Sequence, residues 1–464
     1  MENLQGGELA TKKQSKCRLL LFPLPLQGHL NPMLQLANIL YSKGFSITII
    51  HTLFNSPNSS TYPHFHFHSI PLSLSQSESQ SSGVDITAFL NSLNTKCAEP
   101  FRQSLAGLLS HFRQTNETVG CLITDAVWYF SQTIADELKI NRIILRTSNI
   151  TCFLAFSYFP LLRKKGYIPQ QDPQMDDEVP DLPPLRVKDI PTVKSTDPET
   201  LEKLLNNMID AAKRSSGIIF NSCDLLEQSE LIKLRRELNV PIFTIGPFNK
   251  LFPAAASSLL VQDRSSISWL DKQEPKSVLY VSFGSLVTLS KTEFVEIATG
   301  LANSGKPFLW VVRVGLVRGS GWLEGLPDGF SDEIEGRGYI VKWAPQEEVL
   351  GHPAVGGFWT HSGWNSTLES ICEGIPMMCF PIAGDQMVNA RYVSFVWKIG
   401  IQIEEKLDRE RVEKGIRRLM IEEKEEMTEK AMDLKRKVDD CLKEDDGSSY
   451  RNMKDLFAHI LSFY

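Results

Sequence analysis

Short hydrophobic runs alternate with helical patterns along the first half of the chain. Arg18–Phe22 is an apolar run, Pro23–Asn31 has the composition of a loop, and apolar positions at helical spacing extend over Pro32–Ser42. Phe45–His51 then has the pattern of a second strand. Continuous apolar strands separated by helices are typical of parallel sheets. The pattern therefore predicts an α/β fold.

The same order recurs further along the chain. Gly120–Thr124 predicts a strand, Tyr129–Leu138 a helix and Arg142–Leu145 another strand. Two long loops rich in serine and proline, Ser69–Ser82 and Ile168–Leu185, interrupt this alternation. Long loops inside an α/β domain often frame a binding site, so we expect one on this half.

A change of composition around Ile245–Arg264 divides the chain. Gly246-Pro247 and Ala254–Ser258 are typical of a linker. Strand–helix alternation then restarts. The restarting elements are Val278–Phe283, Lys291–Asn303 and Phe308–Val312. The expected divisions are a first domain over 1–248 with residues 1–16 disordered, a linker over 249–264, a second domain over 265–445, and a C-terminal segment over 446–464 that contains an amphipathic helix at Tyr450–Phe463.

Composition and charge narrow the class of protein. The 464 residues are 42% hydrophobic and 22% charged, with a net charge of −6, which argues against a nucleic-acid partner. No apolar stretch approaches the roughly 18–20 residues of a membrane span. The run Leu19–Leu26 is too short, and too interrupted by proline, for a secretory signal. None of the eight cysteines forms a C-x-x-C pair, which favours buried free thiols and a cytoplasmic location.

Most of the candidate chemistry lies between Trp343 and Gln386. Strand-like runs at Gly356–Trp359 and Met377–Phe380 enclose a small-residue turn, and a helical pattern over Trp364–Glu373 follows the turn directly. The start of a helix offers unpaired backbone N–H groups and the positive end of a dipole, which suit a phosphate. The polar side chains nearby are His361, Asn365 and Ser366 at the helix start, and Glu369, Asp385 and Gln386, which suit sugar hydroxyls. The segment therefore predicts a sugar-nucleotide site.

A candidate general base lies in the first half. His29 follows the first strand, and ligands of doubly wound sheets bind outside the carboxyl ends of the strands. Gly28 is expected to form a tight turn that leaves the His29 imidazole, a suitable base near neutral pH, facing the crevice. Asp125 follows another strand and is a candidate partner that orients the imidazole. The residues alone do not show that the two side chains meet.

Each of these residues has a plainer interpretation. His29 alone is compatible with an ordinary loop histidine, and Asp125 with a helix N-cap. Trp343 and Trp364 are compatible with core aromatics, and Glu369 with an exposed helical position. The alternation His64-Phe65-His66-Phe67-His68 predicts three histidines on one strand face. With no further ligand at metal-binding spacing, a polar strand face is favoured there over a metal site.

The segment Trp343–Gln386 resembles, over its full length, the signature box of plant family-1 UDP-glycosyltransferases. The shared motifs are the opening Trp-Ala-Pro-Gln, the central His-Ser-Gly-Trp-Asn-Ser and the closing Asp-Gln, and the resemblance extends from Gln27-Gly28-His29 to the C-terminal helix. It implies a GT-B fold, in which two Rossmann-like doubly wound domains face a cleft. The first domain is then expected to bind the acceptor and the second the UDP-sugar, and the C-terminal helix of 446–464 is expected to pack back on the first domain. Phrases such as Tyr41–Thr48 resemble the subgroup that glucosylates terpenoids (steviol glycosides, iridoids) and cytokinins.

The resemblance also implies a reaction and its residues. The enzyme is expected to be an inverting hexosyltransferase that moves glucose from UDP-glucose to a hydroxyl of a small lipophilic metabolite, with His29 as base and Asp125 as its partner. No metal or other cofactor is implied. The implied donor-binding residues are Ser285, Trp343 on uracil, Ala344, Gln346 on the nucleoside, His361, Gly363, Trp364, Asn365, Ser366, Glu369 on the ribose, Asp385, Gln386 and Thr147. Gln386 favours glucose over galactose.

The acceptor side is less determined. The candidate acceptor residues are Leu26, Arg146, Leu201, Leu205, Met208 and Gly384. Arg146 is expected to pair with an internal carboxylate, and the alternative is that it favours an acidic or strongly polar acceptor. Transfer to nitrogen of a cytokinin-like acceptor and a non-catalytic UDP-sugar-binding protein remain as alternative functions. The partners are otherwise expected to be small molecules only, with the protein a monomer that has no integral membrane segment.

Overall fold

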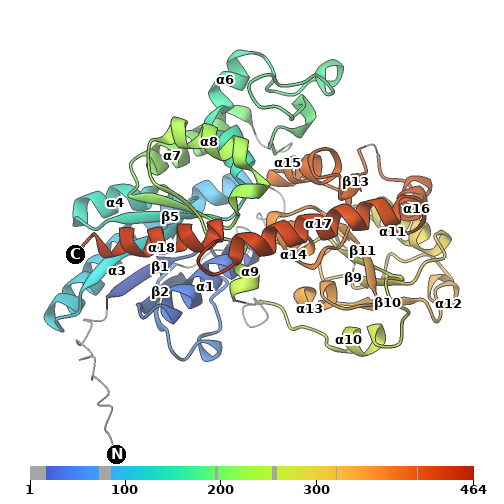
Figure 1. Cartoon of the computed structure of the whole chain (residues 1–464), viewed down its shortest axis with the longest axis horizontal. Coiled ribbons are helices and arrows are strands. Elements are labelled where there is room, and N and C mark those ends of the chain that lie inside the picture. The colour runs from blue at the N-terminus through green and yellow to red at the C-terminus, as the bar shows by residue number, and fades with distance from the viewer. Residues whose placement is uncertain (1–16, 73–84, 194–196, 253–258, 320, 405) are drawn as a thin grey trace, which may run out of the picture.

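The chain folds into two parallel β-sheets that lie side by side, each flanked by helices (Figure 1). The computed structural model describes residues 17–72, 85–193, 197–252, 259–319, 321–404 and 406–464. The expected disorder of residues 1–16, most of the loop Ser69–Ser82 and the Ala254–Ser258 part of the linker lie outside these ranges. Within them, no helix combines the length and apolarity needed to cross a membrane.

The first sheet has seven strands in the order β3-β2-β1-β4-β5-β6-β7, all parallel to their neighbours. The strands are β1 (Arg18–Phe22), β2 (Ser46–Thr52), β3 (His66–Ile70), β4 (Val119–Asp125), β5 (Arg142–Arg146), β6 (Gly217–Phe220) and β7 (Ile242–Thr244). The strand order reverses between β1 and β4. Connections leave these two strands in opposite directions, which opens a crevice at their carboxyl ends.

The second sheet repeats this arrangement with six strands in the order β10-β9-β8-β11-β12-β13. Its strands are β8 (Val278–Ser282), β9 (Phe308–Val311), β10 (Gly338–Val341), β11 (Val355–Thr360), β12 (Met377–Cys379) and β13 (Gly400–Gln402). Here the order reverses between β8 and β11. Both sheets are thus doubly wound and each has its own crevice.

Helices cover both sheets and also join the two halves. Those of the first half are α1 (Gln27–Ser42), α3 (Ile86–Gln114), α4 (Phe130–Leu138), α5 (Ile150–Ser157), α6 (Phe159–Lys164), α7 (Pro198–Lys213), α8 (Gln228–Leu238) and α9 (Phe248–Leu251). Those of the second half are α10 (Ser265–Leu270), α11 (Lys291–Asn303), α12 (Phe330–Glu333), α13 (Gln346–Leu350), α14 (Trp364–Glu373), α15 (Asp385–Arg391), α16 (Arg409–Arg417) and α17 (Lys424–Leu442), and α18 (Ser448–Leu461) ends the chain.

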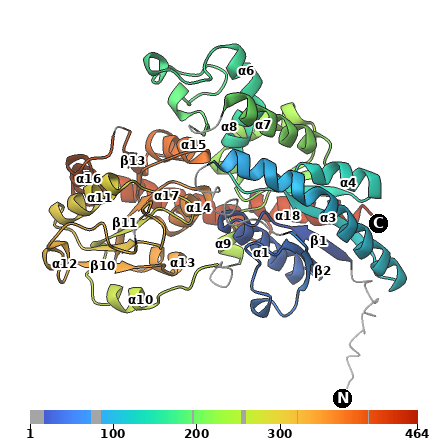
Figure 2. The same ribbon diagram turned by 180° about the vertical axis from the view of Figure 1, so that it is seen from behind.

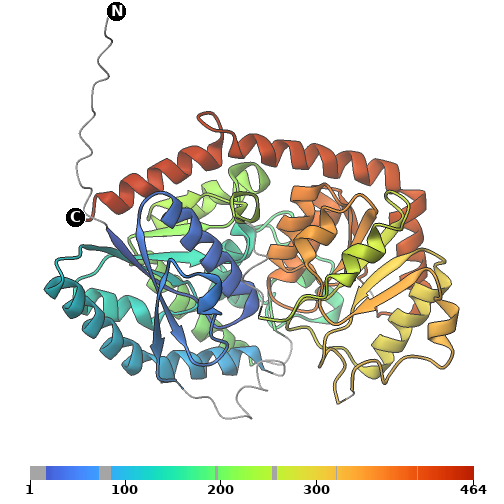
Figure 3. The ribbon, with the colours of Figure 1, turned by 90° about the horizontal axis from the view of Figure 1, so that it is seen from below.

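The last two helices span the molecule. Figure 3 shows α17 and α18 running one after the other across both halves. Helix α17 packs on α14, whereas α18 packs on β7 and β4 and adds Met453, Leu456 and Ile460 to the core of the first half. Helix α18 is in front of the first half in Figure 1 and α3 is in front in Figure 2, so they cover opposite sides of its sheet.

Most predicted elements are confirmed, and the start of the first helix was predicted wrongly. Helix α1 begins at Gln27, so the expected loop up to Asn31 and the tight turn at Gly28 are helical instead. Pro32 lies inside this helix and has no N–H to donate to the Gly28 carbonyl. That carbonyl accepts a hydrogen bond from Asn365 Nδ2 of the other half at 2.9 Å. A donor from helix α14 of the second half thus compensates for a proline that otherwise predicts a helix boundary.

The histidine alternation is also only partly a strand. β3 begins at His66, so His64 precedes the strand and does not share a strand face with His66 and His68. The His64 ring bonds Asn38 Oδ1 of α1 at 3.1 Å. The conformation at His64 is thus set by a contact with helix α1. The alternation of residues along the segment gives no information on such a contact.

A buried carboxylate fixes the start of α5, the helix that follows β5. The Glu227 carboxylate accepts hydrogen bonds from the backbone N–H groups of Ile150 and Thr151, and from the hydroxyls of Thr151 and Ser222. Two of these donors are N–H groups of the first turn of α5, which have no partner within the helix. Burial raises the pKa of Glu227 to about 7.

Replacing Glu227 by Ala is expected to lower the free energy of unfolding by about 2–4 kcal/mol, because it leaves buried donors unpaired. The measurement is urea denaturation followed by circular dichroism. Replacement by Gln tests the protonation step. Because the pKa of Glu227 is higher in the folded than in the unfolded state, its contribution to stability is complete below the unfolded value and is lost as pH rises through about 7.

The wild type is therefore expected to lose stability relative to Glu227→Gln between pH 5 and pH 8. A difference between the two proteins that does not change with pH would contradict the raised pKa. The amide does not titrate, so it serves as the internal reference at each pH.

Candidate active site

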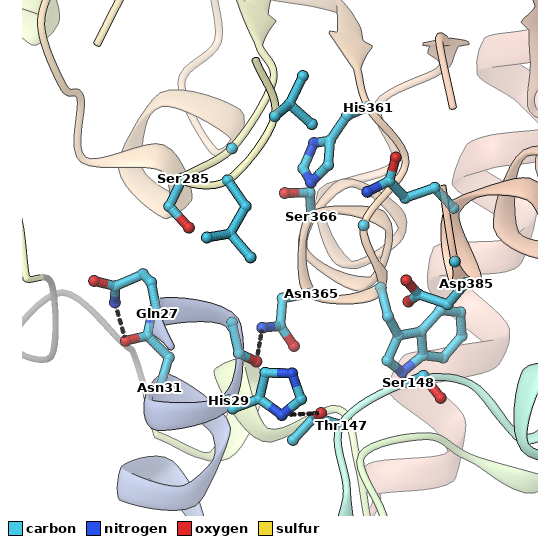
Figure 4. A pocket seen from close by; sticks show the side chains of 18 of the residues that line it. Gln27, His29, Asn31, Thr147, Ser148, Ser285, His361, Asn365, Ser366 and Asp385 are labelled. Atoms are coloured by element: carbon cyan, nitrogen blue, oxygen red, sulfur yellow. Dashed lines mark hydrogen bonds between the residues drawn. The ribbon is translucent and has the colours of Figure 1, made fainter. Parts of the chain in front are cut away.

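A cavity of about 380 Å³ lies between the two halves, at the carboxyl ends of both sheets. Its walls include His29 and Thr147 from the first half, and Ser285, His361 and Asp385 from the second (Figure 4). The two points at which strand order reverses therefore face the same space. Residues that are far apart in the chain, at the ends of β1, β4, β8 and β11, are brought together there.

His29 and Asp125 meet in this cavity. The His29 Nδ1 atom lies 2.7 Å from Asp125 Oδ2 and 3.0 Å from Thr147 Oγ1. The Asp125 side chain is 0% exposed, and its Oδ1 accepts the backbone N–H of Val127 at 2.9 Å. The His29 side chain is 24% exposed and lines the cavity. The carboxylate is thus held from behind and orients a ring whose other nitrogen, Nε2, remains for a ligand.

The start of α14 forms the opposite wall. Gly363 is the N-cap, and Asn365 and Ser366 occupy the first turn, so unpaired N–H groups and polar side chains lie at the cavity. Asn365 also donates to the Gly28 carbonyl, next to His29 in the chain (Figure 4). This hydrogen bond links the helix that carries the histidine with the helix whose start suits a phosphate.

His361 is held between two glycines. An added Cβ would lie 2.6 Å from the His361 ring at Gly284, where φ is +71°, and 2.6 Å from it at Gly363. Burial lowers the pKa of His361 to about 4, so the ring is neutral at pH 7. Its buried Nδ1 has no hydrogen-bond partner among the described residues. His361 lines the cavity next to a helix start, so a neutral ring is available there to a bound ligand.

Replacing Gly284 by Ala is expected to lower kcat/KM for the predicted sugar-nucleotide substrate about ten-fold, through displacement of the His361 ring and strain at positive φ. The measurement is initial rate against substrate concentration. Gly305→Ala is the matched control, because Gly305 also has positive φ but an added Cβ there meets nothing within 4 Å. Equal effects of both substitutions would show that strain alone, not His361, is responsible.

Polar side chains form a connected chain deeper in the second half. The Tyr280 hydroxyl donates to Gln346 Oε1, and Gln346 Nε2 donates to Ser366 Oγ at 2.9 Å and to Glu369 Oε2 at 2.6 Å. Burial raises the pKa of Glu369 to about 8, with Glu347 as a further cause. Glu369 is therefore not the exposed helical position of the plainer interpretation. Trp343 and Ala344 line the cavity beside this chain.

Three further predicted residues, Trp364, Asp385 and Gln386, line the cavity from the second half. Trp364 is almost fully buried, and its indole N–H donates to the Asn221 carbonyl of the first half at 2.8 Å. Asp385 Oδ2 accepts from Asn389, and burial raises the pKa of Asp385. Gln386 Oε1 accepts the backbone N–H of Ile382, which fixes the orientation of the amide. The indole N–H of Trp364 is thus used in joining the halves.

The predicted acceptor residues separate into two groups. Leu201, Leu205, Met208 and Gly384 line the cavity, whereas Leu26 is packed in the core of the first half. Sequence reasoning missed several apolar lining residues. These are Ile86, Leu90, Val127, Phe156, Val193 and Leu204. An amphipathic pattern in α3 and α7 indicates that such residues are buried, but not that they border a cavity.

The expected ion pair of Arg146 is absent. Arg146 is 7% exposed, and no carboxylate of the described residues lies within ion-pair distance of its guanidinium. Nε donates to the Ser148 hydroxyl at 2.8 Å, and Nη1 lies 3.7 Å from Met208 Sδ. β5 ends at Arg146, so the side chain reaches the apolar wall of the cavity and not a carboxylate of the interior.

Comparison with known proteins identifies relatives of the whole chain. The family model described as "UDP-glucoronosyl and UDP-glucosyl transferase" matches residues 268–441. UDP-glycosyltransferase 76B1 of Arabidopsis thaliana is 52% identical over 452 residues, which cover 97% of this chain and 99% of the relative. UDP-glycosyltransferase 76G1 of Stevia rebaudiana is 46% identical over 458 residues, covering 97% of this chain and 98% of the relative.

A solved structure shows the same architecture. Phytolacca americana UGT2, complexed with UDP-2fluoro-glucose and pterostilbene, superposes with a TM-score of 0.78 at 26% identity, covering 96% of this chain and 99% of that chain. This similarity, together with two doubly wound parallel sheets, confirms the GT-B fold.

Proposed function

Because the chain belongs to the plant family-1 UDP-glycosyltransferases and acts on small plant metabolites, we propose that it transfers glucose from UDP-glucose to an acceptor hydroxyl with inversion at the anomeric carbon. One observation carries this proposal. An oriented histidine and a helix start suited to a diphosphate face each other across a single cavity. A base on one side and a leaving-group site on the other is the arrangement that an in-line displacement requires.

His29 is the proposed general base. Its Nδ1–H donates to Asp125, which leaves Nε2 unprotonated and able to take the proton of the acceptor hydroxyl. The hydroxyl oxygen then forms a bond to the anomeric carbon, and the bond from that carbon to the UDP oxygen breaks. The electron pair leaves with UDP. Asp125 stabilises the imidazolium that forms.

The start of α14 is the proposed diphosphate site. His361, Asn365, Ser366 and the more distant Ser285 place donors around it, with Gly363 as the N-cap. Such donors stabilise the charge that develops on UDP, and this requires no metal ion. We propose that Trp343, Ala344, Gln346 and Glu369 hold the nucleoside. The proposed sugar contacts are Thr147, Trp364, Asp385 and Gln386.

Glucose is the proposed donor sugar. The Gln386 oxygen is occupied by the Ile382 N–H, so the amide presents its NH₂ group to the cavity lined by this residue. Two donors next to the Asp385 carboxylate suit a pair of adjacent sugar hydroxyls.

The acceptor is proposed to be a small lipophilic molecule such as a terpenoid, a glycosylated terpenoid, a phenolic or a hormone. Leu201, Leu205, Met208 and Gly384 form part of its pocket. We propose that residues 1–248 bind it, that 265–445 bind the donor, and that 249–264 and 446–464 connect the halves. All eight cysteines are buried and unpaired, which supports a reducing compartment such as the cytoplasm. A monomer suffices, since one chain supplies every proposed group.

The test is incubation of the purified protein with UDP-glucose and a panel of hydroxylated acceptors, with the products identified by mass and by the anomeric proton coupling in NMR. A β-glucoside from UDP-glucose, and a slower reaction with UDP-galactose, are expected. Products retaining the α-configuration of the donor would rule out inversion. UDP-glucose binding without transfer to any acceptor would indicate a non-catalytic binding protein, and a nitrogen-linked product from a cytokinin would indicate N-glucosylation.

A further inference from the structure

Arg146 is a buried cation whose contacts are all uncharged. It is 7% exposed, and its hydrogen-bond acceptors are the Ser148 hydroxyl and the Met208 thioether. Its Cζ lies 5.5 Å from the centre of the Phe153 ring and 5.3 Å from that of Phe156. A guanidinium has five N–H donors, and these two bonds use only Nε and one hydrogen of Nη1. The Cys152 thiol is a further uncharged partner of the guanidinium, and no carboxylate of the described residues forms an ion pair with it.

An arrangement of this kind is costly in the free protein. Burying an unpaired charge is unfavourable, and aromatic faces and a sulfur atom offset only part of that cost. A carboxylate that acts on Arg146 through space is Asp385, which comes from the second half and already accepts a hydrogen bond from Asn389. No ion pair joins Asp385 to Arg146, and Asp385 is a proposed sugar contact. A partner for Arg146 must therefore come from elsewhere.

Four acidic residues line the cavity, Glu347, Glu348, Glu369 and Asp385. Among the described residues, every aspartate and glutamate that lines it comes from the second half. The first-half lining near Arg146 is apolar, with Leu201, Leu205, Met208 and Phe156 as its main members. The acceptor side is thus a largely apolar compartment with a fixed cation in its wall, and Thr147, the residue after Arg146, contacts the proposed base His29.

We infer that the acceptor carries a carboxylate, which Arg146 binds while His29 activates a hydroxyl of the same molecule. This rests on the proposed function. The guanidinium offers a planar fork that matches a carboxylate, and a low-dielectric wall strengthens the pair. The hydroxyl is the nucleophile: its proton passes to His29 Nε2 and its oxygen bonds the anomeric carbon as UDP leaves. The product is an O-glucoside that retains a free acid, not a glucose ester.

Matched acceptors test this inference. The probes are 2-, 3- and 4-hydroxybenzoate and their methyl esters, which vary the spacing between hydroxyl and charge on one scaffold. The best acid is expected to exceed its ester in kcat/KM by about 10- to 100-fold, the range of a hydrogen bond to a charged group. The product formed from the acid is expected to resist mild alkaline hydrolysis because it is an O-glucoside. A glucose ester would be cleaved under the same conditions.

Replacing Arg146 by Met should remove that preference, because kcat/KM for the acid falls while that for the ester is unchanged or rises. Arg146→Lys should restore part of it, since a cation is kept without the planar fork. Benzoate, which has a carboxylate and no hydroxyl, is expected to inhibit the wild type competitively against the acceptor and to lose this effect in Arg146→Met. Arg214→Met, which alters an exposed arginine paired with Asp136, is the control.

Three results would overturn the inference. If the wild type has a higher kcat/KM for the esters than for the acids, Arg146 does not bind an acceptor carboxylate. An Arg146→Met variant that slows acid and ester equally would assign Arg146 to the donor side or to folding. Alkali-labile products would make the carboxylate the nucleophile. Failure of every acid, ester and other hydroxylated acceptor to be glucosylated would instead overturn the proposed function itself.

Discussion

The His29→Ala variant is expected to lose about 10²- to 10⁴-fold in kcat for glucose transfer, the usual contribution of a positioned general base. Among the described residues that line the cavity, His29 is the one histidine whose ring is oriented by a carboxylate, which bonds Nδ1 and leaves Nε2 for the acceptor. Without it, the acceptor hydroxyl must lose its proton to water. The measurement is the steady-state rate of UDP release with saturating UDP-glucose and acceptor.

Donor binding separates this effect from damage to the fold. The His29→Ala variant should bind UDP with an unchanged Kd in calorimetry, because the proposed diphosphate contacts lie on the second half. His111→Ala, which alters an exposed histidine of α3, should keep full turnover. Near-normal kcat in His29→Ala with intact UDP binding would contradict the assignment of His29 as base.

Much of the fold was predictable from the sequence, because parallel strands that are buried on both faces consist of continuous runs of apolar residues. The residues Arg18–Phe22 and Lys291–Asn303 form the strand and the helix that were predicted, with the same ends. The start of α1 was not predictable in this way. Pro32 weakens a helix locally, and the compensating donor, Asn365, lies more than 300 residues away in the chain. Local pattern contains no information on such a partner.

The candidate site shows the same division. The groups around α14 lie within one segment of the sequence, so a sugar-nucleotide site could be predicted there from the sequence alone. Arg146 was expected to pair with an internal carboxylate, yet it lines the cavity and donates to the Ser148 hydroxyl. Leu26 was expected at the acceptor and lies in the core. Which apolar residues border a cavity depends on how α3, α5 and α7 pack, and this is a property of the tertiary structure.

Asp125→Asn is expected to lower kcat by about 10²- to 10³-fold, although the substitution changes almost no volume. The Val127 N–H donates to Asp125 Oδ1, so the amide oxygen is expected to take that position. The amide NH₂ then replaces Oδ2, 2.7 Å from His29 Nδ1. A donor at that point forces Nδ1 to accept and moves the imidazole proton to Nε2, where it blocks proton abstraction.

A change of tautomer leads to an order of activities that loss of charge alone does not. Asp125→Ala also removes the carboxylate but imposes no tautomer, because the Thr147 hydroxyl, 3.0 Å from Nδ1, both donates and accepts. Turnover is therefore expected to fall in the order wild type, Asp125→Ala, Asp125→Asn, with UDP binding retained in all three. Thr147→Val keeps the Asp125 contact and should cost less than either. A more active Asp125→Asn than Asp125→Ala would mean that Asp125 acts through its charge and not by selecting the tautomer of His29.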